Sequence, residues 1–490
     1  MDDLQLLFSR RHPLVAACEP AWDRTRQAYA GGRAYIEAAL VKHMAESVPA
    51  FDERKARAYY VNLPRKIARL ISNFLLSAPP QRDGADAAVA DDWSRDGRSA
   101  DDVMLQVSTM LNCYGLAWVL VDMPKVAGAV DLETKQRQRI RPFARPLSPF
   151  KVRDWANGPD GRLQWALVAE WRTADDDPFA ERATYERRRL WTRTDWRLFE
   201  KGKDGAVAEV EKAVHGLGAV PLVMLDEPDG FGIGSVSHWF EDVVRLSDAI
   251  LNNGSEAQMN IVKQMFGLLV ISEQFANSRS GLAPTATETI PLSSREDLPV
   301  EDTESFAHAI GRSVAIWETA EEKGLTRYIG PTGAETAAIR AENAALKEEL
   351  FDMVGLALQH GSKQAQTAES KAWDSVAINQ GLAWRAGLLE QCERRAWELF
   401  HAWDSTVEIP NVAYNRDFAV KDIEKTVASI MELSSFDAGR EYGRETMRAA
   451  LAALNELHPV PAETQERILA EIDKLDGTPT APAHREPQDV

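Results

Sequence analysis

Cysteine is scarce in this sequence, and long apolar runs are absent. The 490 residues include three cysteines, Cys18, Cys113 and Cys392, with no CxxC spacing. Neither a disulfide framework nor a zinc-binding knuckle is therefore expected, and we predict three small buried side chains. No apolar run approaches the ~18 residues that span a bilayer, and acids precede the first apolar patch, unlike in a secretory signal. We expect a soluble protein that acts in a cytoplasm.

Positive charge is also in deficit. The 57 Lys and Arg residues face 75 Asp and Glu residues, which leaves a formal net charge of −18. A chain this acidic repels phosphate overall, so a conventional DNA-binding domain is not expected. The composition, 44% hydrophobic and 27% charged, is typical of a globular protein. A chain of this length has room for about three domains.

Catalytic and metal-binding motifs are missing as well. The nine histidines form no HExxH pair, and the sequence contains no GxSxG elbow. Adjacent acids such as Glu348 and Glu349 point apart on a helix, so they do not converge on one reacting atom. We therefore expect neither an enzyme nor a bound cofactor or metal.

One glycine-rich loop is the exception that an enzyme could use. A strand expected over Val220–Leu225 is followed by the loop Gly230–Gly234 and a helix, and such a helix N-terminus can hold a pyrophosphate. However, the third glycine comes one residue early, and no GKS or GKT sequence follows. A connection between a sheet and a helix explains the loop better, with a nucleotide-dependent enzyme as the alternative.

Apolar periodicity predicts an α+β fold. Apolar residues recur at helical spacing from about Pro13 to Gly115, and Ser99 can cap one of these helices. Short apolar runs of strand length then continue to about residue 225. Turn residues at 157–161 and at Thr194-Asp195 separate neighbouring runs, which predicts an antiparallel sheet.

Two helices are predicted on either side of a small insert. Residues 236–266 place apolar side chains at spacings of three, four and seven, which predicts one long amphipathic helix. The Asn-Asn-Gly sequence at 252–254, with a cap at Ser255, leaves a two-helix alternative open. The second helix is predicted over Ala334–Val354.

The insert and the C-terminal part complete the pattern. Within the insert, 314–317 and 326–329 are predicted to be two short strands that pair with each other. Apolar residues then recur from Thr367 to Trp403, which at about 1.5 Å per residue predicts a helix of roughly 55 Å. Shorter helices are expected to about residue 475, and residues 476–490 are expected to be disordered.

Basic residues gather in the predicted sheet region. Residues 135–153 contain seven Lys and Arg residues and no acid, and a second group at 182–197 lies beside Trp191 and Trp196. Such groups can hold phosphates and stack on bases, whereas alternation along strands favours a solvated sheet face. The candidate phosphate contacts are Arg137, Arg139, Arg141, Arg187, Arg188 and Arg189.

Five segments occur in a specific order along the chain: His12–Gly32, Tyr60–Phe74, Asn112–Asp122, Ile329–Gly333 and Thr367–Ser370. This order, which spans most of the chain, resembles that of the portal proteins of tailed bacteriophages. The segments are similar, in turn, to the portal N-terminal segment, the first wing helix, the step from helix to strand, the start of the second stem helix and the segment after the tunnel loop.

The resemblance implies a ring, usually of twelve subunits, at one vertex of a capsid, with wing, stem, clip and crown regions around a DNA channel. The Asn-Asn-Gly sequence at 252–254 is unusual for a stem helix. The implied regions are the wing at 1–235, the first stem helix at 236–266, the clip at 267–333, the second stem helix at 334–354, the tunnel loop at 355–366, the long wing helix with its following loop at 367–415, the crown and C-terminal helices at 416–475, and the tail at 476–490.

The resemblance also implies a passive channel and a set of partners. A portal contains no ATPase, so the large terminase that docks on it supplies the work, and double-stranded DNA passes without sequence specificity. The other implied partners are further copies of the chain, the major capsid protein, the scaffolding protein and the head–tail adaptor proteins. The protein would be assembled in the host cytoplasm and would become part of the virion, and it would not interact with a membrane.

Two sets of side chains are candidates for the channel. We expect Glu342, Glu348 and Glu349 to form part of a wall that repels DNA, because twelve copies of a chain with net charge −18 carry roughly −216. The alternative for these three residues is that they are ordinary acids on a helix surface. The alternative for the whole chain is that it is another ring or scaffold component of a virion. The residues expected to touch DNA from the tunnel loop are Gln359, His360, Lys363, Gln364 and Gln366.

Overall fold

The fold of the computed structural model is α+β, as the periodicity predicted. The chain divides into two compact units, Met1–Asp417 and Phe418–Val490. The structure describes residues 3–124, 140–174, 183–228, 236, 238–265, 268–272, 316–318, 327–329, 333–353, 368–418, 432, 440–457 and 462–474. The expected tail at 476–490 lies outside these residues.

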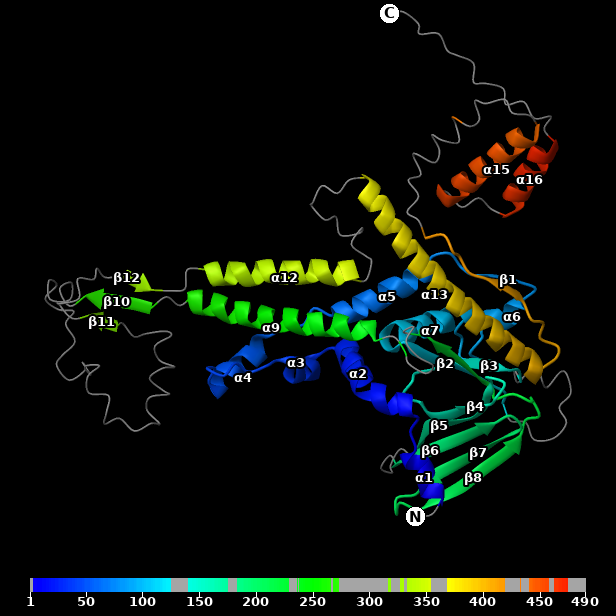
Figure 1. Ribbon diagram of the computed structural model, residues 1–490, viewed down its shortest axis with the longest axis horizontal. Helices are drawn as coiled ribbons and strands as arrows, with labels where there is room; N and C mark the ends of the chain where they lie inside the picture. Colours follow the sequence, from blue (N-terminus) through cyan, green and yellow to red (C-terminus); the bar gives the residue numbers. More distant parts are fainter. Residues whose placement is uncertain are drawn as a thin grey trace, which may run out of the picture. The chain divides into compact units, whose positions relative to one another are not determined.

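Helices dominate the first part of the chain (Figure 1). Three of them, α2, α4 and α5, carry a proline in the first turn and are capped by His12, Ser47 and Asn62. The cap predicted at Ser99 is confirmed and forms a capping box with Asp102, and the helix it starts ends at Gly115 in the left-handed conformation. The helices are α1 Asp3–Ser9, α2 Pro13–Ala30, α3 Arg33–Ala39, α4 Val48–Arg57, α5 Leu63–Leu75, α6 Ala87–Ala90 and α7 Ala100–Tyr114.

Two antiparallel sheets follow α7. The smaller places β2 (Leu116–Asp122) between β3 (Phe143–Leu147) and β9 (Leu222–Asp226). The larger has five strands in chain order, and the two predicted turns, at 157–161 and between Thr192 and Asp195, join β4 to β5 and β6 to β7. Its strands are β4 Val152–Asn157, β5 Leu163–Ala174, β6 Ala183–Thr192, β7 Asp195–Lys201 and β8 Val207–Val214.

A tryptophan-rich core joins the helices to both sheets. Trp22 of α2, Trp118 of β2 and Trp191 of β6 are each at most 1% exposed and belong to one apolar cluster. The Trp22 indole donates a hydrogen bond to the carbonyl oxygen of Tyr114, at 2.9 Å. The three cysteines are buried and free, as expected. The N-terminal helices and the sheets therefore share one core.

The predicted long helix is α13 (Ala368–Trp403), and it carries a buried carboxylate. Glu393 is fully buried and accepts hydrogen bonds from Arg82 at 2.5 and 3.1 Å, from the Tyr414 hydroxyl at 2.6 Å and from the Trp397 indole at 3.1 Å. Burial of the Tyr414 hydroxyl raises its pKa well above the ordinary value, and the negative charge of Glu393 adds to this shift. Because β1 (Gln81–Asp83) pairs with β13 (Asn411–Ala413), this network ties three distant segments together.

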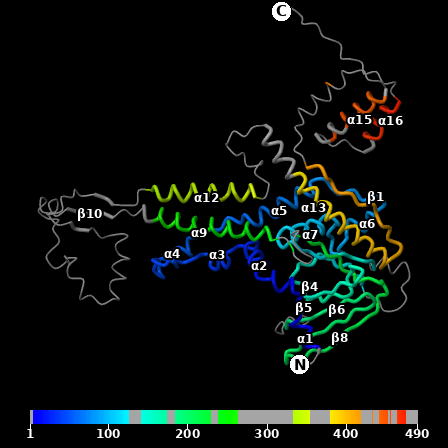
Figure 2. The backbone as a smooth tube through the Cα atoms, viewed as in Figure 1, coloured from blue at the N-terminus to red at the C-terminus, as the bar shows by residue number. Residues whose placement is uncertain are grey.

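Two further helices lie side by side and flank a small sheet in the chain order (Figures 1 and 2). They are α9 (Trp239–Met265) and α12 (Ala334–Met353), as predicted. The predicted pairing of the two insert strands is wrong: β11 (Ile316–Glu318) and β12 (Arg327–Ile329) exist, but β10 (Leu268–Ser272) lies between them. The apolar β10 pairs with β11 in parallel and with β12 antiparallel.

The second unit contains two helices in its described part, α15 (Arg440–Leu457) and α16 (Ala462–Lys474). Arg444 donates to the carbonyl oxygen of Asp473 at 3.0 Å, and Arg448 pairs with the Asp473 carboxylate at 2.6 Å. These contacts hold the two helices together, so this unit has internal order of its own.

The buried carboxylate network makes a prediction about stability. Replacing Glu393 by Ala leaves Arg82, which is 12% exposed, without its buried partner, and the free energy of unfolding is expected to fall by about 3–5 kcal/mol. Chemical denaturation measures the change. The matched control is Glu53→Ala, which removes an exposed ion pair with Arg57 and should cost at most about 1 kcal/mol. Equal, small effects of the two substitutions would contradict the role given to Glu393.

Candidate functional site

The centre of the candidate site is α9, which lies between α12 on one side and α3 and α4 on the other (Figure 1). Polar side chains of α9 that face α3 and α4 form hydrogen bonds with these segments and fix the position of α9. The Asn252 amide donates to the carbonyl oxygen of Ala39 at 3.1 Å and accepts from the amide of Val41 at 2.9 Å. One side chain of α9 therefore completes the hydrogen bonding of the backbone that leaves α3.

Two further residues of α9, Ser255 and Asp248, extend this attachment. The Arg54 guanidinium, which is 3% exposed, donates to the Ser255 hydroxyl at 2.8 Å and pairs with Glu46 at 2.8 Å. Asp248 accepts from the Tyr35 hydroxyl and pairs with Arg24 at 2.5 Å. Burial is the main cause that raises the pKa of Tyr35, and the hydrogen bond to Asp248 raises it further.

These contacts explain why α9 is continuous. The Asn-Asn-Gly sequence at 252–254 lies inside the helix, so one long helix is confirmed and the two-helix alternative is wrong. Asn252 and Ser255, which favoured a break in the sequence, instead hydrogen-bond to segments on α3 and α4. Tertiary contacts override the local tendency of asparagine to end a helix.

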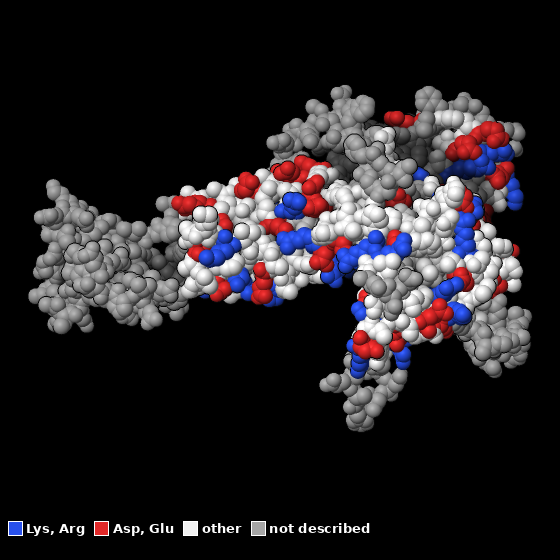
Figure 3. Space-filling view, turned by 60° about the horizontal axis from the view of Figure 1, so that its bottom comes forward, with Lys and Arg blue, Asp and Glu red and all other residues white. Residues whose placement is uncertain are grey.

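The second helix, α12, has two distinct faces. Its inner face carries buried Thr336 and Leu350, and half-buried Asn343 donates to the carbonyl oxygen of Ile250 in α9, at 3.4 Å. The predicted wall acids Glu342, Glu348 and Glu349 are all exposed. Figure 3 shows acidic side chains along the upper edge of the rod that α9 and α12 form. The acids are thus exposed to solvent in the single chain, and their role as a channel wall stays a prediction.

Four of the candidate arginines of the sheet region are paired with acids in the single chain. Burial lowers the pKa of Arg188, with Glu186 opposing this shift, and Arg189 also lies over the Trp196 ring, 4.4 Å from its centroid. To bind a phosphate, these arginines would first have to release a carboxylate. The pairs are Arg141–Asp92 at 2.8 Å, Arg187–Glu200 at 2.5 Å, Arg188–Glu186 at 2.6 Å and Arg189–Glu170 at 2.7 Å.

Several predicted residues lie outside the described part of the chain. They are Arg137 and Arg139, the glycine loop Gly230–Gly234, and the tunnel-loop residues Gln359, His360, Lys363, Gln364 and Gln366. Within the residues that the structure describes, no three His, Cys, Asp or Glu side chains lie close enough together to hold a metal ion. No helix in the same residues is long and apolar enough to cross a membrane.

Sequence reasoning missed two features of the structure. One is the buried network around Glu393, and the other is a recess in which Lys151 lies against Trp171. The only sequence signal for the second was the basic group at 135–153, which contains Lys151. Neither could be found from spacing, because the contributing residues come from segments far apart in the chain.

Two chains from solved structures are similar to this chain at low identity. One belongs to "Virion of native gene transfer agent (GTA) particle", with 8% identity over 84% of this chain and 98% of that chain and a TM-score of 0.40. The other belongs to "Neck of empty GTA particle computed with C6 symmetry", with 10% identity, 85% and 98% coverage and a TM-score of 0.41. No protein-family model and no curated protein matches the sequence.

Because α9 is continuous through Gly254, we expect that replacing this glycine stabilises the protein. Gly254 lies inside the helix, and a Cβ atom added there would meet only Asn343 Nδ2, at 3.9 Å, which is ordinary contact. Gly254→Ala should therefore raise the free energy of unfolding by about 0.5–1 kcal/mol, because alanine favours a helix interior. Thermal denaturation measures this as a higher Tm.

The control for this prediction is Gly115→Ala. Gly115 ends α7 at a φ of +67°, where a residue with a side chain is strained, so this substitution should lower the stability by about 1 kcal/mol or more. If Gly254→Ala also lowers the Tm, the helix is not continuous through residue 254, or α12 lies closer to it than described.

Proposed function

We propose that this chain is the subunit of a portal ring in a phage-like particle, and that the ring is the channel for packaging and ejection of DNA. The observation that carries the proposal is the pair α9 and α12. These two long helices pack together, a small sheet is inserted between them in the chain, and the 36-residue α13 follows. This is the order of stem, clip, stem and wing helix that the sequence resemblance implies.

In this proposal α12 faces the channel and α9 joins it to the wing. The exposed Glu342, Glu348 and Glu349 give the outer face of α12 a negative charge, which would repel the DNA phosphates and let the duplex slide. The attachment of α9 to α3 and α4 would carry force from the stem into the wing. The ring performs no chemistry and needs no cofactor, since the motor that docks on it supplies the work.

The partners follow from this position at a capsid vertex. The ring would contain about twelve copies of the chain. The large terminase would dock on the clip, which includes the sheet of β10, β11 and β12, during packaging, and the head–tail adaptor proteins would dock there afterwards. The major capsid protein and the scaffolding protein would contact the wing. The protein would assemble in the host cytoplasm and remain in the virion. The second candidate is another ring or scaffold component of the particle, which should lack the order of stem helix, insert and stem helix.

Charge reversal on α12 tests the channel role. Glu348→Lys with Glu349→Lys should let the wall hold duplex DNA about tenfold more tightly at low salt and should slow packaging and ejection. Packaging rates in a system with terminase and procapsids, and gel retardation by the assembled protein, measure the two effects.

The matched control is Glu209→Lys with Glu211→Lys. It makes the same change of charge on exposed residues of β8, in the wing sheet, and should leave packaging and DNA retention nearly unchanged. Equal effects of the two double variants would show that total charge matters and that the α12 face has no special role.

A further inference from the structure

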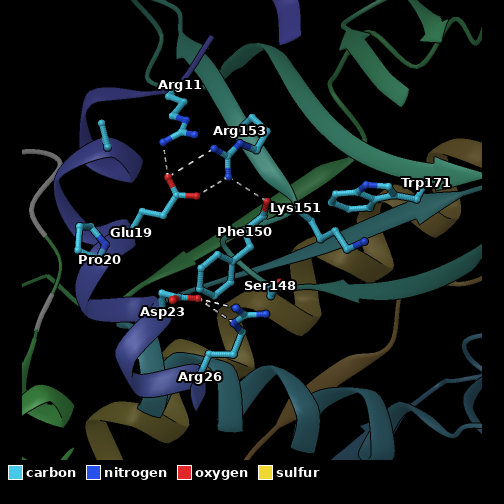
Figure 4. A pocket seen from close by; sticks show the side chains of 11 residues that line it. Arg11, Glu19, Pro20, Asp23, Arg26, Ser148, Phe150, Lys151, Arg153 and Trp171 are labelled. Carbon is cyan, nitrogen blue, oxygen red and sulfur yellow. Dashed lines mark hydrogen bonds and ion pairs between the residues drawn. The ribbon is translucent and has the colours of Figure 1, made fainter. Parts of the chain in front are cut away.

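A recess of about 670 Å³ opens between α2 and the strands β4 and β5 (Figure 4). Its volume is in the range of sites that bind small groups. Four cationic and two acidic side chains line it, so its walls carry an excess of two positive charges. These side chains are Arg11, Arg26, Lys151, Arg153, Glu19 and Asp23.

The two acids of the recess are already neutralised. Glu19 lies between two guanidinium groups and pairs with Arg11 at 2.7 Å and with Arg153 at 2.9 Å. Asp23 pairs with Arg26 at 2.5 Å. Within the described residues, neither acid forms an ion pair with Lys151. The excess of two positive charges therefore lies on Lys151 and on the Arg11–Glu19–Arg153 group, in which two guanidinium groups share one carboxylate.

Lys151 has an aromatic neighbour in place of a carboxylate. Its ammonium lies 4.0 Å from the centroid of the Trp171 ring, and no ion pair of Lys151 is found among the described residues. Burial lowers the pKa of Lys151, with Glu170 opposing this shift. An anion bound beside the ammonium would offset the cost of burying its charge.

Aromatic rings supply the apolar part of the recess. Trp171 is 51% exposed, which is unusual for so large an apolar side chain. Phe150 lies deeper, with the Arg26 guanidinium 5.6 Å from its ring centroid. Figure 4 shows Lys151 and Trp171 together at one side of the recess and the Arg11, Glu19 and Arg153 group at the other.

We propose that this recess binds an acidic segment of a partner polypeptide, with one carboxylate at Lys151 and an apolar side chain against Trp171 and Phe150. Duplex DNA fits less well, because a duplex is too wide to enter a concave site of this volume. A carboxylate on a flexible side chain can reach Lys151, while an apolar side chain next to it in the same peptide contacts the aromatic rings.

Binding of a labelled synthetic peptide to the full chain tests the proposal. The probe has glutamates on both sides of a phenylalanine, and fluorescence anisotropy at low salt measures the dissociation constant. Lys151→Met should weaken binding about tenfold or more, because a charge-assisted contact is lost. Lys151→Arg should retain affinity within about threefold, and Trp171→Leu should weaken binding through loss of the aromatic surface.

The matched control is Lys212→Met, which removes an exposed lysine of β8 outside the recess and should leave the affinity unchanged. Thermal melts of the variants show whether each one is folded. Three results would overturn the proposal: equal binding of a peptide in which glutamines replace the glutamates, unchanged binding by folded Lys151→Met, or displacement of the peptide by a short DNA duplex at equal concentration. None of these readouts depends on ring assembly.

Discussion

The fold depends on the attachment of one helix, α9, along nearly its whole length. Val243, Val244 and Ser247 are at most 2% exposed, so one face of this part of the helix is buried. Asn252 and Ser255 then bind the backbone and side chains of the α3 and α4 region. This fixed helix supports α12, because the two helices pack against each other along their sides.

The sequence predicted the long elements well because periodicity is a local property that length reinforces. The bounds of α12 and α13 agree with the predictions within a residue or two. The turn at 157–161 was predictable for a related reason, since glycine and proline act locally. The pairing of β11 with β12 was predicted wrongly because the choice of strand partners is not local, and β10 competes for both of them.

The same distinction applies to the candidate site. The exposure of Glu342 and Glu349 could be predicted from the apolar stripe of one helix. The Glu393 network could not, because Arg82 lies 311 residues away from it in the chain. The arginines of the sheet region show a further limit, since composition indicates a basic surface but only the strand register shows that Glu170 and Glu200 lie beside Arg189 and Arg187.

The central claim is that copies of this chain close into a ring with an open channel. Mass photometry of the purified full chain at two salt concentrations, followed by negative-stain imaging, tests this directly. We expect a species of about twelve chains of 54.5 kDa, roughly 650 kDa in total, with a central hole in end-on views. Large particles without a hole, or a compact monomer that binds ATP at both salt concentrations, would contradict the claim.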